Sequence, residues 1–395
     1  MKNYILFDSQ ERNHFLPLCF TRPVAELRVG ILTIREKWER RLPGNYSWRT
    51  QAYLLTKYPE KITDQNILIN AHLCPTDELI SRLKELNPGQ GVSWEGKMVA
   101  VCLDKESALN FPAQLDDIQW TAFEGALEFI QYPWDLTEKN GHQIHLDFDF
   151  LTHERESAPI SNTNQLIHPE HIFVEPGAKL EYATINASHG PVYIGSDAEI
   201  MEGCLIRGPF ALCDHGIVNM GSKIYGGTTI GPFSKVGGEV SQSILLGHSN
   251  KGHDGFLGNS VIGQWCNLGA GTNVSNLKNN YQQVKAWNYP ARRFIKTGLQ
   301  FCGLIMGDHS KAGINTMFNT GTVVGVACNI HGPGFPRQFV PSFAEGGVGG
   351  FKCHALKNVF NTAEMVMARR GESFSSADQQ ILSAVFEQTE TNRSF

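Results

Sequence analysis

The residues whose side chains could most readily take part in a reaction lie in a glycine-rich stretch in the second half of the chain. Residues 247–258 read Gly-His-Ser-Asn-Lys-Gly-His-Asp-Gly-Phe-Leu-Gly. An imidazole accepts a proton near neutral pH because its unperturbed pKa is about 6.5. His253 is therefore a candidate general base, with a plain surface histidine as the alternative interpretation.

Three histidines, His248, His253 and His309, also raise the hypothesis of a metal site. Zinc in catalytic sites takes three protein ligands, and imidazole is one of its usual ligands. No neighbouring carboxylate singles out three of the fourteen histidines. We therefore predict that this region holds no metal.

The element that must position these residues repeats one apolar residue at every sixth position. The runs are Ile194, Ile200, Ile206, Leu212, Val218, Ile224, Ile230 and Val236, then Phe256, Ile262, Leu268 and Val274, then Met306, Ala312, Phe318, Val324 and Ile330. Period six fits neither a lone helix nor a lone two-faced strand and is the signature of a parallel β-helix. The alternative, a β-sandwich, predicts strands spaced by 8–12 residues. Glycine often follows the repeated residue, where we expect backbone angles that disfavour larger side chains.

Composition limits the function classes. A net charge of −5 and a pI near 6.3 provide no basic surface for nucleic acid. The nine cysteines contain no C-x-x-C pair, so neither a zinc ribbon nor a disulfide framework is indicated. No signal segment or 18-residue apolar run is found, so we expect a cytoplasmic protein with no membrane partner.

Glycine is distributed unevenly along the chain. Only seven of the 39 glycines precede residue 161. This shift predicts an α/β domain over residues 1–155, a β-helix over 156–345 and a C-terminal helical tail over 346–395.

Short apolar runs in the first 155 residues alternate with helix signals. Strands are predicted over 4–7, 66–70 and 98–103, with helices over 31–42 and from Pro75 onward. Such alternation favours a parallel α/β sheet.

Two further segments lie outside the sixfold pattern. In the tail, Asn361 with Glu364 and Ser376 with Gln379 have capping-box spacing, so each pair predicts a helix start. Residues 277–298 break the sixfold repeat, and loops leaving a solenoid tend to lie on its binding face.

The segment from His253 to Asn276 resembles the acetyltransferase half of the bifunctional N-acetylglucosamine-1-phosphate uridyltransferase and glucosamine-1-phosphate acetyltransferase family. In that family a catalytic His stands three residues before an aromatic residue and leads into an aliphatic-Gly pair, as His253, Phe256, Leu257 and Gly258 do here. The family's Asn-aliphatic-Gly-Ala-Gly-Thr segment matches Asn267 to Thr272, and a following Asn matches Asn276. The chain departs from the family at Phe256 and Leu277, where the family has Tyr.

A weaker resemblance covers nearly the whole chain. An α/β domain followed by a left-handed β-helix is the arrangement of sugar-1-phosphate nucleotidyltransferases with an acyltransferase tail. Residues 16–18, 21–23 and Leu27 resemble the region after that family's nucleotide loop. Tyr132 to Leu136 is similar to an element of a divergent sugar nucleotidyltransferase branch.

The resemblance implies a transferase acting in cell-envelope polysaccharide synthesis. Its donor would be acetyl-CoA, its acceptor an amino sugar phosphate or nucleotide sugar, and its assembly a homotrimer with sites between subunits. His253 would be the base, and amides near Gly269 and Ala270 would stabilise the oxyanion. The other candidate binding residues are Asn267, Asn276, Phe256, Lys251 and Arg22.

Two alternatives to acyl transfer remain: an active nucleotidyltransferase with a structural β-helix, or a solenoid that binds a sugar nucleotide without chemistry. Against the first, residues 8–14 contain no glycine to cradle a phosphate, and Val24 and His72 stand where the family has its catalytic Lys and metal-binding Asp. We expect Mg²⁺ only if nucleotidyl transfer is retained.

Overall fold

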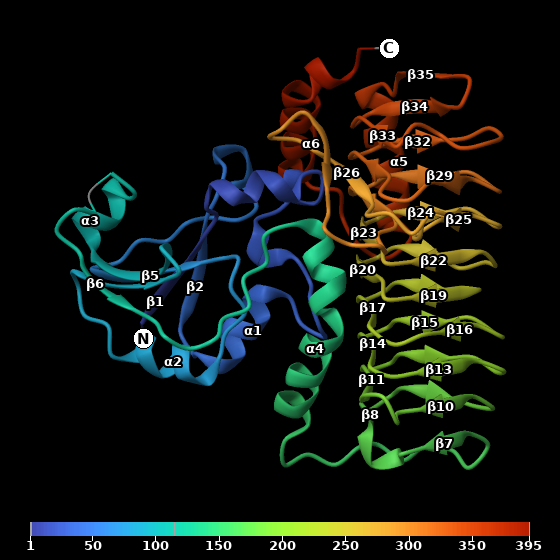
Figure 1. Cartoon of the computed structure of the whole chain (residues 1–395), viewed down its shortest axis with the longest axis horizontal. Helices are drawn as coiled ribbons and strands as arrows, with labels where there is room; N and C mark the ends of the chain where they lie inside the picture. Colours follow the sequence, from blue (N-terminus) through green and yellow to red (C-terminus); the bar gives the residue numbers. More distant parts are fainter. Residues whose placement is uncertain (1, 114, 395) are drawn as a thin grey trace. The chain divides into compact units, whose positions relative to one another are not determined.

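The computed structural model describes residues 2–113 and 115–394. The chain divides into two compact units, one of residues 1–15, 22–27 and 32–131 and the other of residues 16–21, 28–31 and 132–395. The described part has the predicted order of an α/β domain, a left-handed parallel β-helix and a helical tail (Figure 1). The domain limits at 155 and 345 stay predictions.

The first unit contains one sheet with strand order β2-β1-β3-β5-β4-β6. The strands are β1 (Asn3–Phe7), β2 (Asn45–Arg49), β3 (Gln65–Asn70), β4 (Gln90–Trp94), β5 (Lys97–Asp104) and β6 (Gln119–Ala122). The helices are α1 (Ile34–Arg41), α2 (Asp77–Lys84) and α3 (Lys105–Asn110), with 3-10 turns η1 (Gln10–Phe15), η3 (Val24–Glu26) and η4 (Ala52–Leu54).

The prediction of an all-parallel sheet was wrong for β5. β5 runs antiparallel to both β3 and β4. Only Glu95 and Gly96 separate β4 from β5, and both have positive φ, 49° and 76°. Such a two-residue turn forms a tight hairpin, which the helix-strand alternation of the sequence did not distinguish from a crossover.

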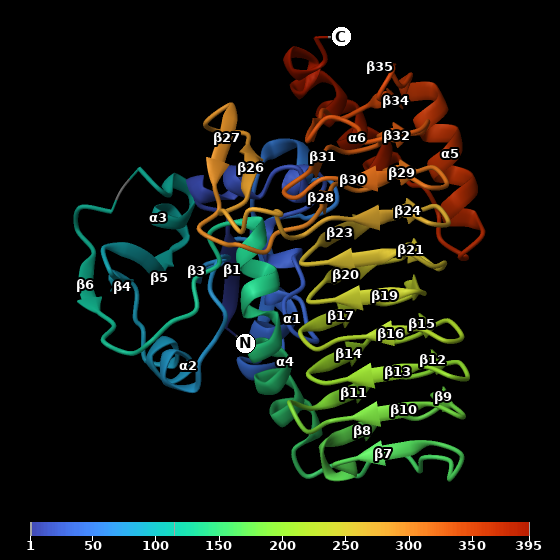
Figure 2. The same ribbon diagram turned by 45° about the vertical axis from the view of Figure 1, so that its right-hand side comes forward.

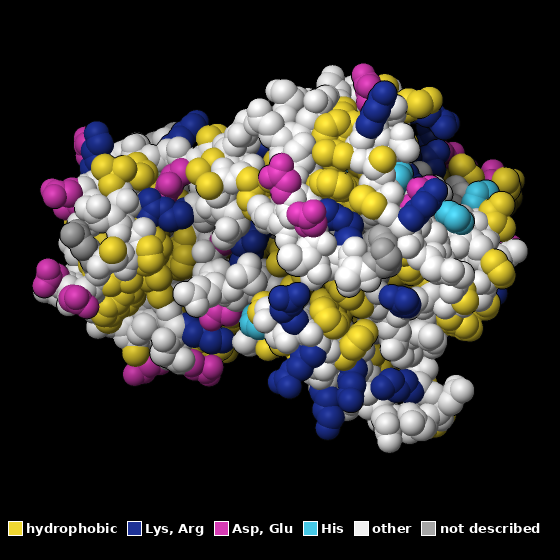
Figure 3. Space-filling view, turned by 90° about the horizontal axis from the view of Figure 1, so that it is seen from above, with side chains coloured by type: hydrophobic (Ala, Val, Ile, Leu, Met, Phe, Trp, Pro, Cys, Tyr) yellow, Lys and Arg dark blue, Asp and Glu magenta, His cyan; other side chains and the backbone are white. Residues whose placement is uncertain are grey.

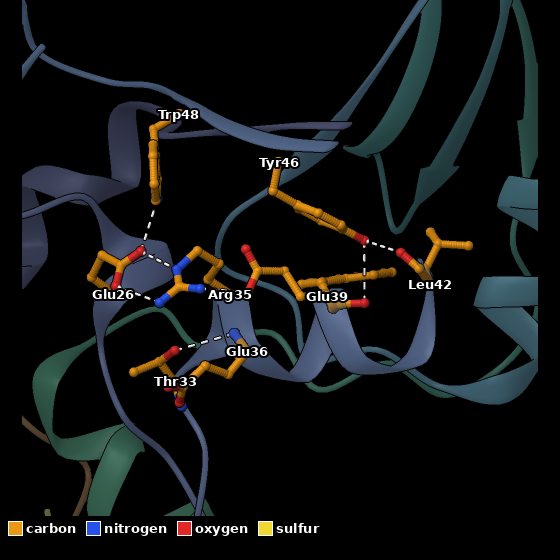
Figure 4. Close-up of polar contacts among 9 residues, drawn as sticks. Glu26, Thr33, Arg35, Glu36, Glu39, Leu42, Tyr46 and Trp48 are labelled. Atoms are coloured by element: carbon orange, nitrogen blue, oxygen red, sulfur yellow. Dashed lines mark hydrogen bonds and ion pairs between the residues drawn. The ribbon is translucent and has the colours of Figure 1, made fainter. Parts of the chain in front are cut away.

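Helix α1 starts later than predicted, because Thr33 caps it. The Thr33 hydroxyl accepts from the Glu36 N–H at 3.1 Å, and the Glu36 carboxylate accepts from the Thr33 N–H at 2.7 Å (Figure 4). On the other side of the helix, Glu26 accepts from Arg35 at 2.6 Å and from the Trp48 indole at 2.9 Å. All the residues in these contacts belong to the first unit.

The second unit is a stack of three-sided coils. One wall has the order β22-β19-β16-β13-β10-β7, a second β33-β31-β28-β23-β20-β17-β14-β11-β8, and a third β35-β34-β32-β29-β24-β21-β18-β15-β12-β9. The first wall comprises β7 (Gln165–Ile167), β10 (Thr184–Asn186), β13 (Leu205–Arg207), β16 (Lys223–Ile224), β19 (Glu239–Ser241) and β22 (Phe256–Gly258). The second comprises β8 (Ile172–Val174), β11 (Val192–Ile194), β14 (Phe210–Leu212), β17 (Thr228–Ile230), β20 (Ile244–Gly247), β23 (Val261–Gln264), β28 (Ile305–Met306), β31 (Val323–Val324) and β33 (Phe339–Val340). The third comprises β9 (Lys179–Leu180), β12 (Glu199–Ile200), β15 (Ile217–Val218), β18 (Lys235–Val236), β21 (Asn250–Lys251), β24 (Asn267–Leu268), β29 (Lys311–Ala312), β32 (Asn329–Ile330), β34 (Ala344–Gly347) and β35 (Gly350–Cys353).

The inward side chains form a continuous aliphatic core, and a shortened coil explains the phase shift in the sequence. Val218 pairs with Val236 eighteen residues later, whereas Val236 pairs with Lys251 only fifteen residues later. The prediction that Phe256 starts the second run was wrong by one residue, since Leu257 is the buried member. The coil therefore continues through the segment where the apolar pattern is interrupted, and Lys251 occupies one of the inward positions there.

The glycines after the repeated residues are needed for close approach and not for unusual backbone angles. A Cβ on Gly231 would lie 2.4 Å from the Leu245 oxygen, and one on Gly325 would lie 2.3 Å from the Ser342 nitrogen. Positive φ falls two residues later, at side chains that include Asp197, Phe233, Trp265, His309 and Ala327. The prediction that the glycine after the repeated residue adopts the unusual backbone angles was therefore wrong, because these angles occur two residues later.

Helix α4 (Pro133–Thr152) lies beside the second wall of the coil in both views (Figures 1 and 2). The buried Asn140 amide donates to the Gly227 carbonyl at 2.9 Å and to the Thr229 hydroxyl at 3.0 Å. Its oxygen accepts from the Gly30 N–H at 2.7 Å. One side chain thus joins α4, the coil and the segment 28–31.

Between β24 and β28 in the chain, residues 277–298 interrupt the coils with a hairpin, β26 (Lys285–Asn288) with β27 (Arg293–Lys296), and a short pair joins β25 (Asn273–Val274) to β30 (Met317–Phe318). The hairpin exposes Lys285, Arg292, Arg293 and Lys296. The view from above shows Lys and Arg side chains in several groups on this face of the molecule (Figure 3).

The tail contains two helices, α5 (Leu356–Ala368) and α6 (Ser376–Gln388), and ends with η6 (Glu390–Asn392). The prediction that Asn361 starts a helix was wrong, because Asn361 lies inside α5. The second start is one residue earlier than predicted, since Ser375 and Asp378 form the capping box. Nowhere in the described ranges is a helix both long and apolar enough to cross a bilayer.

We expect Asn140→Ala to lower the free energy of unfolding of the second unit by about 2–4 kcal/mol, because it leaves the buried Gly30 N–H and Gly227 carbonyl without the hydrogen bonds that Asn140 supplies. Urea denaturation measures the change. The control is Asp149→Ala on the exposed side of α4, which should change stability by less than about 0.5 kcal/mol. Equal effects for the two variants would contradict the anchoring role of Asn140.

Candidate functional site

A pocket of about 750 Å³ opens on the third wall of the coil, and His253, Asn267, Gly269 and Ala270 line it. His253 lies on the turn after β21, and Asn267 begins β24, the strand paired with β21. Stacking of adjacent coils therefore brings four of the predicted site residues into one wall. His253 is exposed, so its imidazole is accessible to a ligand.

Several basic side chains line the pocket, which the motif did not indicate. Its basic side chains are Lys235, Lys311, Arg369 and Arg370, and none of the described residues that line it is Asp or Glu. Arg370, just past α5, donates to the Phe233 carbonyl at 2.8 Å and to the Asn250 side chain at 2.9 Å. The tail is thereby attached to the coil, and it supplies part of the wall of the pocket.

Lys251, predicted to bind substrate, lies in the core and does not line the pocket. Its side chain is 1% exposed. The ammonium donates to the Gly237 carbonyl at 2.9 Å and to the His253 carbonyl at 2.6 Å. Burial lowers the pKa of Lys251 to about 8, against an attraction to Asp254 that raises it.

The two predicted oxyanion donors differ in availability. The Gly269 N–H already donates to the Ala312 carbonyl at 2.9 Å as part of the coil ladder, so it cannot serve an oxyanion without breaking that bond. The Ala270 N–H has no acceptor among the described residues. Ala270 is thus the donor that the geometry leaves for a ligand.

Three predicted site residues lie away from this pocket. The Asn276 amide, just after β25, donates to the Asn259 side chain at 2.8 Å, and the Phe256 N–H, on β22 of the first wall, donates to the Asn273 side chain at 2.9 Å. Neither residue lines the pocket. Arg22 is buried in the α/β unit.

Aromatic rings, not metal ligands, occupy the corner next to the pocket. The Trp265 ring stacks on His248 at 4.2 Å and on His309 at 6.5 Å, so an indole lies between the two imidazoles. Within residues 2–113 and 115–394, no three His, Cys, Asp or Glu side chains gather as a metal site. Trp265 lines the pocket together with His248.

In the α/β unit, the segment at the position of the phosphate loop is filled by its own side chains. Asp8, whose side chain is 1% exposed, accepts from the Val24 N–H at 2.9 Å and from the Thr50 hydroxyl at 2.5 Å, and it pairs with Arg12 at 3.3 Å. Burial raises the pKa of Asp8, and Arg12 opposes that shift. Residues 10–15 form the short helix η1 instead of a glycine loop.

His72 is equally unsuited to Mg²⁺. Its ring is fully buried, stacks on Phe129 at 5.2 Å, and has Nδ1 2.8 Å from the Ile130 carbonyl. Burial lowers the pKa of His72 to about 4, so the ring is neutral at pH 7. Because Mg²⁺ prefers oxygen ligands, the buried imidazole of His72 does not fit the ion.

Comparison with known proteins confirms the resemblance. Residues 4–156 match the family described as sugar nucleotidyl transferase. The chain is 26% identical over 232 residues to a bifunctional sugar-1-phosphate nucleotidylyltransferase/acetyltransferase of Sulfurisphaera tokodaii, covering 58% of this chain and 51% of that protein. It is 36% identical over 90 residues to the bifunctional protein GlmU of Methanocaldococcus jannaschii, covering 23% of this chain and 21% of that one.

The first of these relatives is a transferase by its name, and the chain spans about half the length of the first relative and a fifth of the second. Among solved structures, a polysialic-acid-specific acetyltransferase, NeuO, matches with 13% identity and a TM-score of 0.26, covering 48% of this chain and 82% of that one. The α/β domain is thus nucleotidyltransferase-like in sequence.

The lowered pKa of Lys251 predicts a specific pH dependence of stability. Between pH 8 and about 10.5 the unfolded chain binds a proton that the folded chain has lost, so this residue adds stability as pH rises through that window. We therefore expect the free energy of unfolding of the wild type to increase relative to that of Lys251→Met between pH 7.5 and 10. Urea titrations at several pH values measure it.

The control for that comparison is Lys223→Met, at an exposed position of β16. Its stability should run parallel to that of the wild type over the same pH range. Parallel curves for Lys251→Met as well would contradict the predicted titration.

Proposed function

We propose that the coil transfers an acetyl group from acetyl-CoA to the amine of an amino sugar phosphate or nucleotide sugar. The observation that carries this proposal is the exposed imidazole of His253 in a pocket with four basic side chains and no carboxylate. Both substrates carry phosphates, which basic side chains bind by charge-assisted hydrogen bonds. The acetyltransferase half of the named relatives supports the same reaction class.

The reaction needs one base and one oxyanion donor. The amine nitrogen attacks the thioester carbonyl while His253 takes its proton, and the Ala270 N–H donates to the developing oxyanion. The intermediate collapses as the C–S bond breaks, and the leaving thiolate takes the proton back from the imidazolium. The products are the amide and free coenzyme A, with Asn267 orienting a substrate beside His253.

The phosphates are assigned to the tail and the coil together. Lys235 and Arg369 line the pocket, and the structure shows no carboxylate paired with either among the described residues. Arg369 is exposed and follows α5, whereas Lys235 begins β18. The proposal includes a cytoplasmic homotrimer and a role in building cell-envelope polysaccharide, as the resemblance implies.

We predict that His253→Ala lowers kcat for acetyl transfer by about 10²–10⁴-fold, because a positioned base typically contributes that factor. Free thiol release from acetyl-CoA with a panel of amino sugar phosphates measures it. His189→Ala, an exposed coil histidine outside the pocket, is the control and should retain wild-type turnover. Full activity in His253→Ala would end this mechanism.

Arg369→Ala should raise KM for the phosphate-bearing substrates by about tenfold and leave kcat within twofold, since loss of a charge-assisted contact weakens binding by about 1.5 kcal/mol. Lys357→Ala, exposed on α5 and not lining the pocket, is the matched control. The prediction fails if both variants change KM equally.

A second candidate, nucleotidyl transfer by the α/β unit, is favoured by the family match over residues 4–156. We propose that this activity is lost or altered, because Asp8 and η1 occupy the loop position, Val24 offers no charge, and His72 does not fit Mg²⁺.

The corresponding prediction is no pyrophosphate release with Mg²⁺ across a panel of sugar-1-phosphates and nucleoside triphosphates. Robust turnover with any pair would overturn it. Loss of that turnover in Arg22→Ala would then assign phosphate binding to Arg22.

A further inference from the structure

The turn that carries His253 is held by three successive carbonyl groups. The Gly252 carbonyl accepts from the Asn219 amide at 2.7 Å, the His253 carbonyl from the Lys251 ammonium at 2.6 Å, and the Asp254 carbonyl from the Gly271 N–H at 3.0 Å. The donors come from two coils earlier, after β15, from the same coil, and from the following turn, after β24. The backbone on both sides of the imidazole is thus fixed, although the His253 side chain itself is exposed.

Of these three donors, Lys251 is the unexpected one. It occupies the inward position between Val236 and Leu268, where the other coils place aliphatic side chains such as Ile200 and Val218. Burying an ammonium is unfavourable unless hydrogen bonds compensate, and an aliphatic residue of similar size would pack there without that cost. Packing alone therefore does not account for a lysine at this position.

The direction of its hydrogen bonds indicates what the lysine does. The ammonium reaches past the corner of the coil and joins the Gly237 carbonyl of the previous coil to the His253 carbonyl of its own turn. A charged donor makes hydrogen bonds roughly twice as strong as a neutral one. It ties the turn of His253 to the rigid coil beneath it.

We propose that Lys251 is a positioning residue that sets the placement of the His253 imidazole in the pocket. The inference rests on the acetyl transfer proposed above, in which the imidazole must meet the acceptor amine within hydrogen-bond reach. Displacement of a catalytic group by about 1 Å lowers turnover by about 100-fold. Lys251 acts through His253 and touches neither substrate.

The principal variant is Lys251→Met, which keeps the length and the apolar stem and removes the donor. We expect kcat to fall about 10–100-fold with KM for both substrates within twofold, and the melting temperature not to fall, because methionine suits an apolar core. In a His253→Ala background, Lys251→Met should cause no further loss of kcat. A merely structural lysine would instead lower the melting temperature and affect the two backgrounds equally.

Two further variants complete the comparison. Leu212→Met, a buried core position on β14, is the control for repacking and should leave kcat unchanged. Lys251→Gln keeps a neutral donor and should retain more turnover than Lys251→Met. If Lys251→Met does not fold, the comparison of Lys251→Gln with the wild type, alone and with His253→Ala, decides the question.

Amide hydrogen exchange separates failure of this inference from failure of the proposed function. Lys251→Met should accelerate exchange in residues 252–255 but not in the neighbouring strands. Faster exchange without acetyl transfer in the wild type would overturn the proposed function and leave the structural tie intact. Unchanged kcat in Lys251→Met, or a further loss in the double variant, would overturn the positioning role.

Discussion

The structure depends on the stacking of successive coils, in which every inward position must be filled and every corner must let the next coil approach. Glycines at the corners satisfy the second requirement, as at Gly325, where a Cβ would lie 2.3 Å from the Ser342 nitrogen. Aliphatic residues satisfy the first at nearly all positions. Because the coils are rigidly paired, a side chain placed at one corner has a defined neighbour on the next coil.

That constraint explains how the pocket acquires its chemistry. Pairing of β21 with β24 brings the turn of His253 beside Asn267, Gly269 and Ala270, which are distant by one coil in sequence. The ladder also limits what these residues can do, since the Gly269 N–H is already bonded to Ala312. The Ala270 N–H and the exposed His253 imidazole are therefore the groups in this segment that can hydrogen-bond to a ligand in the pocket.

The tail changes the electrostatics of the same pocket. Arg369 and Arg370 follow α5 and add two guanidinium groups to a pocket that Lys235 also lines. Arg370 also bonds the coil directly, so the tail is attached to the coil at the pocket that it helps to line. The tail, which carries no recognisable catalytic motif, thus supplies part of the pocket. In the α/β unit, by contrast, Asp8 fills the position of the phosphate loop through its hydrogen bonds to the Val24 N–H and the Thr50 hydroxyl.

Sequence alone predicted the β-helix, because one inward residue per side must recur at a fixed period. The candidate site in residues 253–272 was predicted from the resemblance of that segment to a family motif. The sequence also placed β1, β3 and α2 closely, since apolar runs and caps are local signals. Tertiary structure alone decided the antiparallel return of β5, the burial of Lys251 and the arrival of Arg369 at the pocket. The burial of Lys251 and the arrival of Arg369 depend on which distant segment packs alongside, and neither residue type nor period carries that information. The return of β5 depends on the backbone angles of the Glu95-Gly96 turn, which strand and helix signals do not reveal.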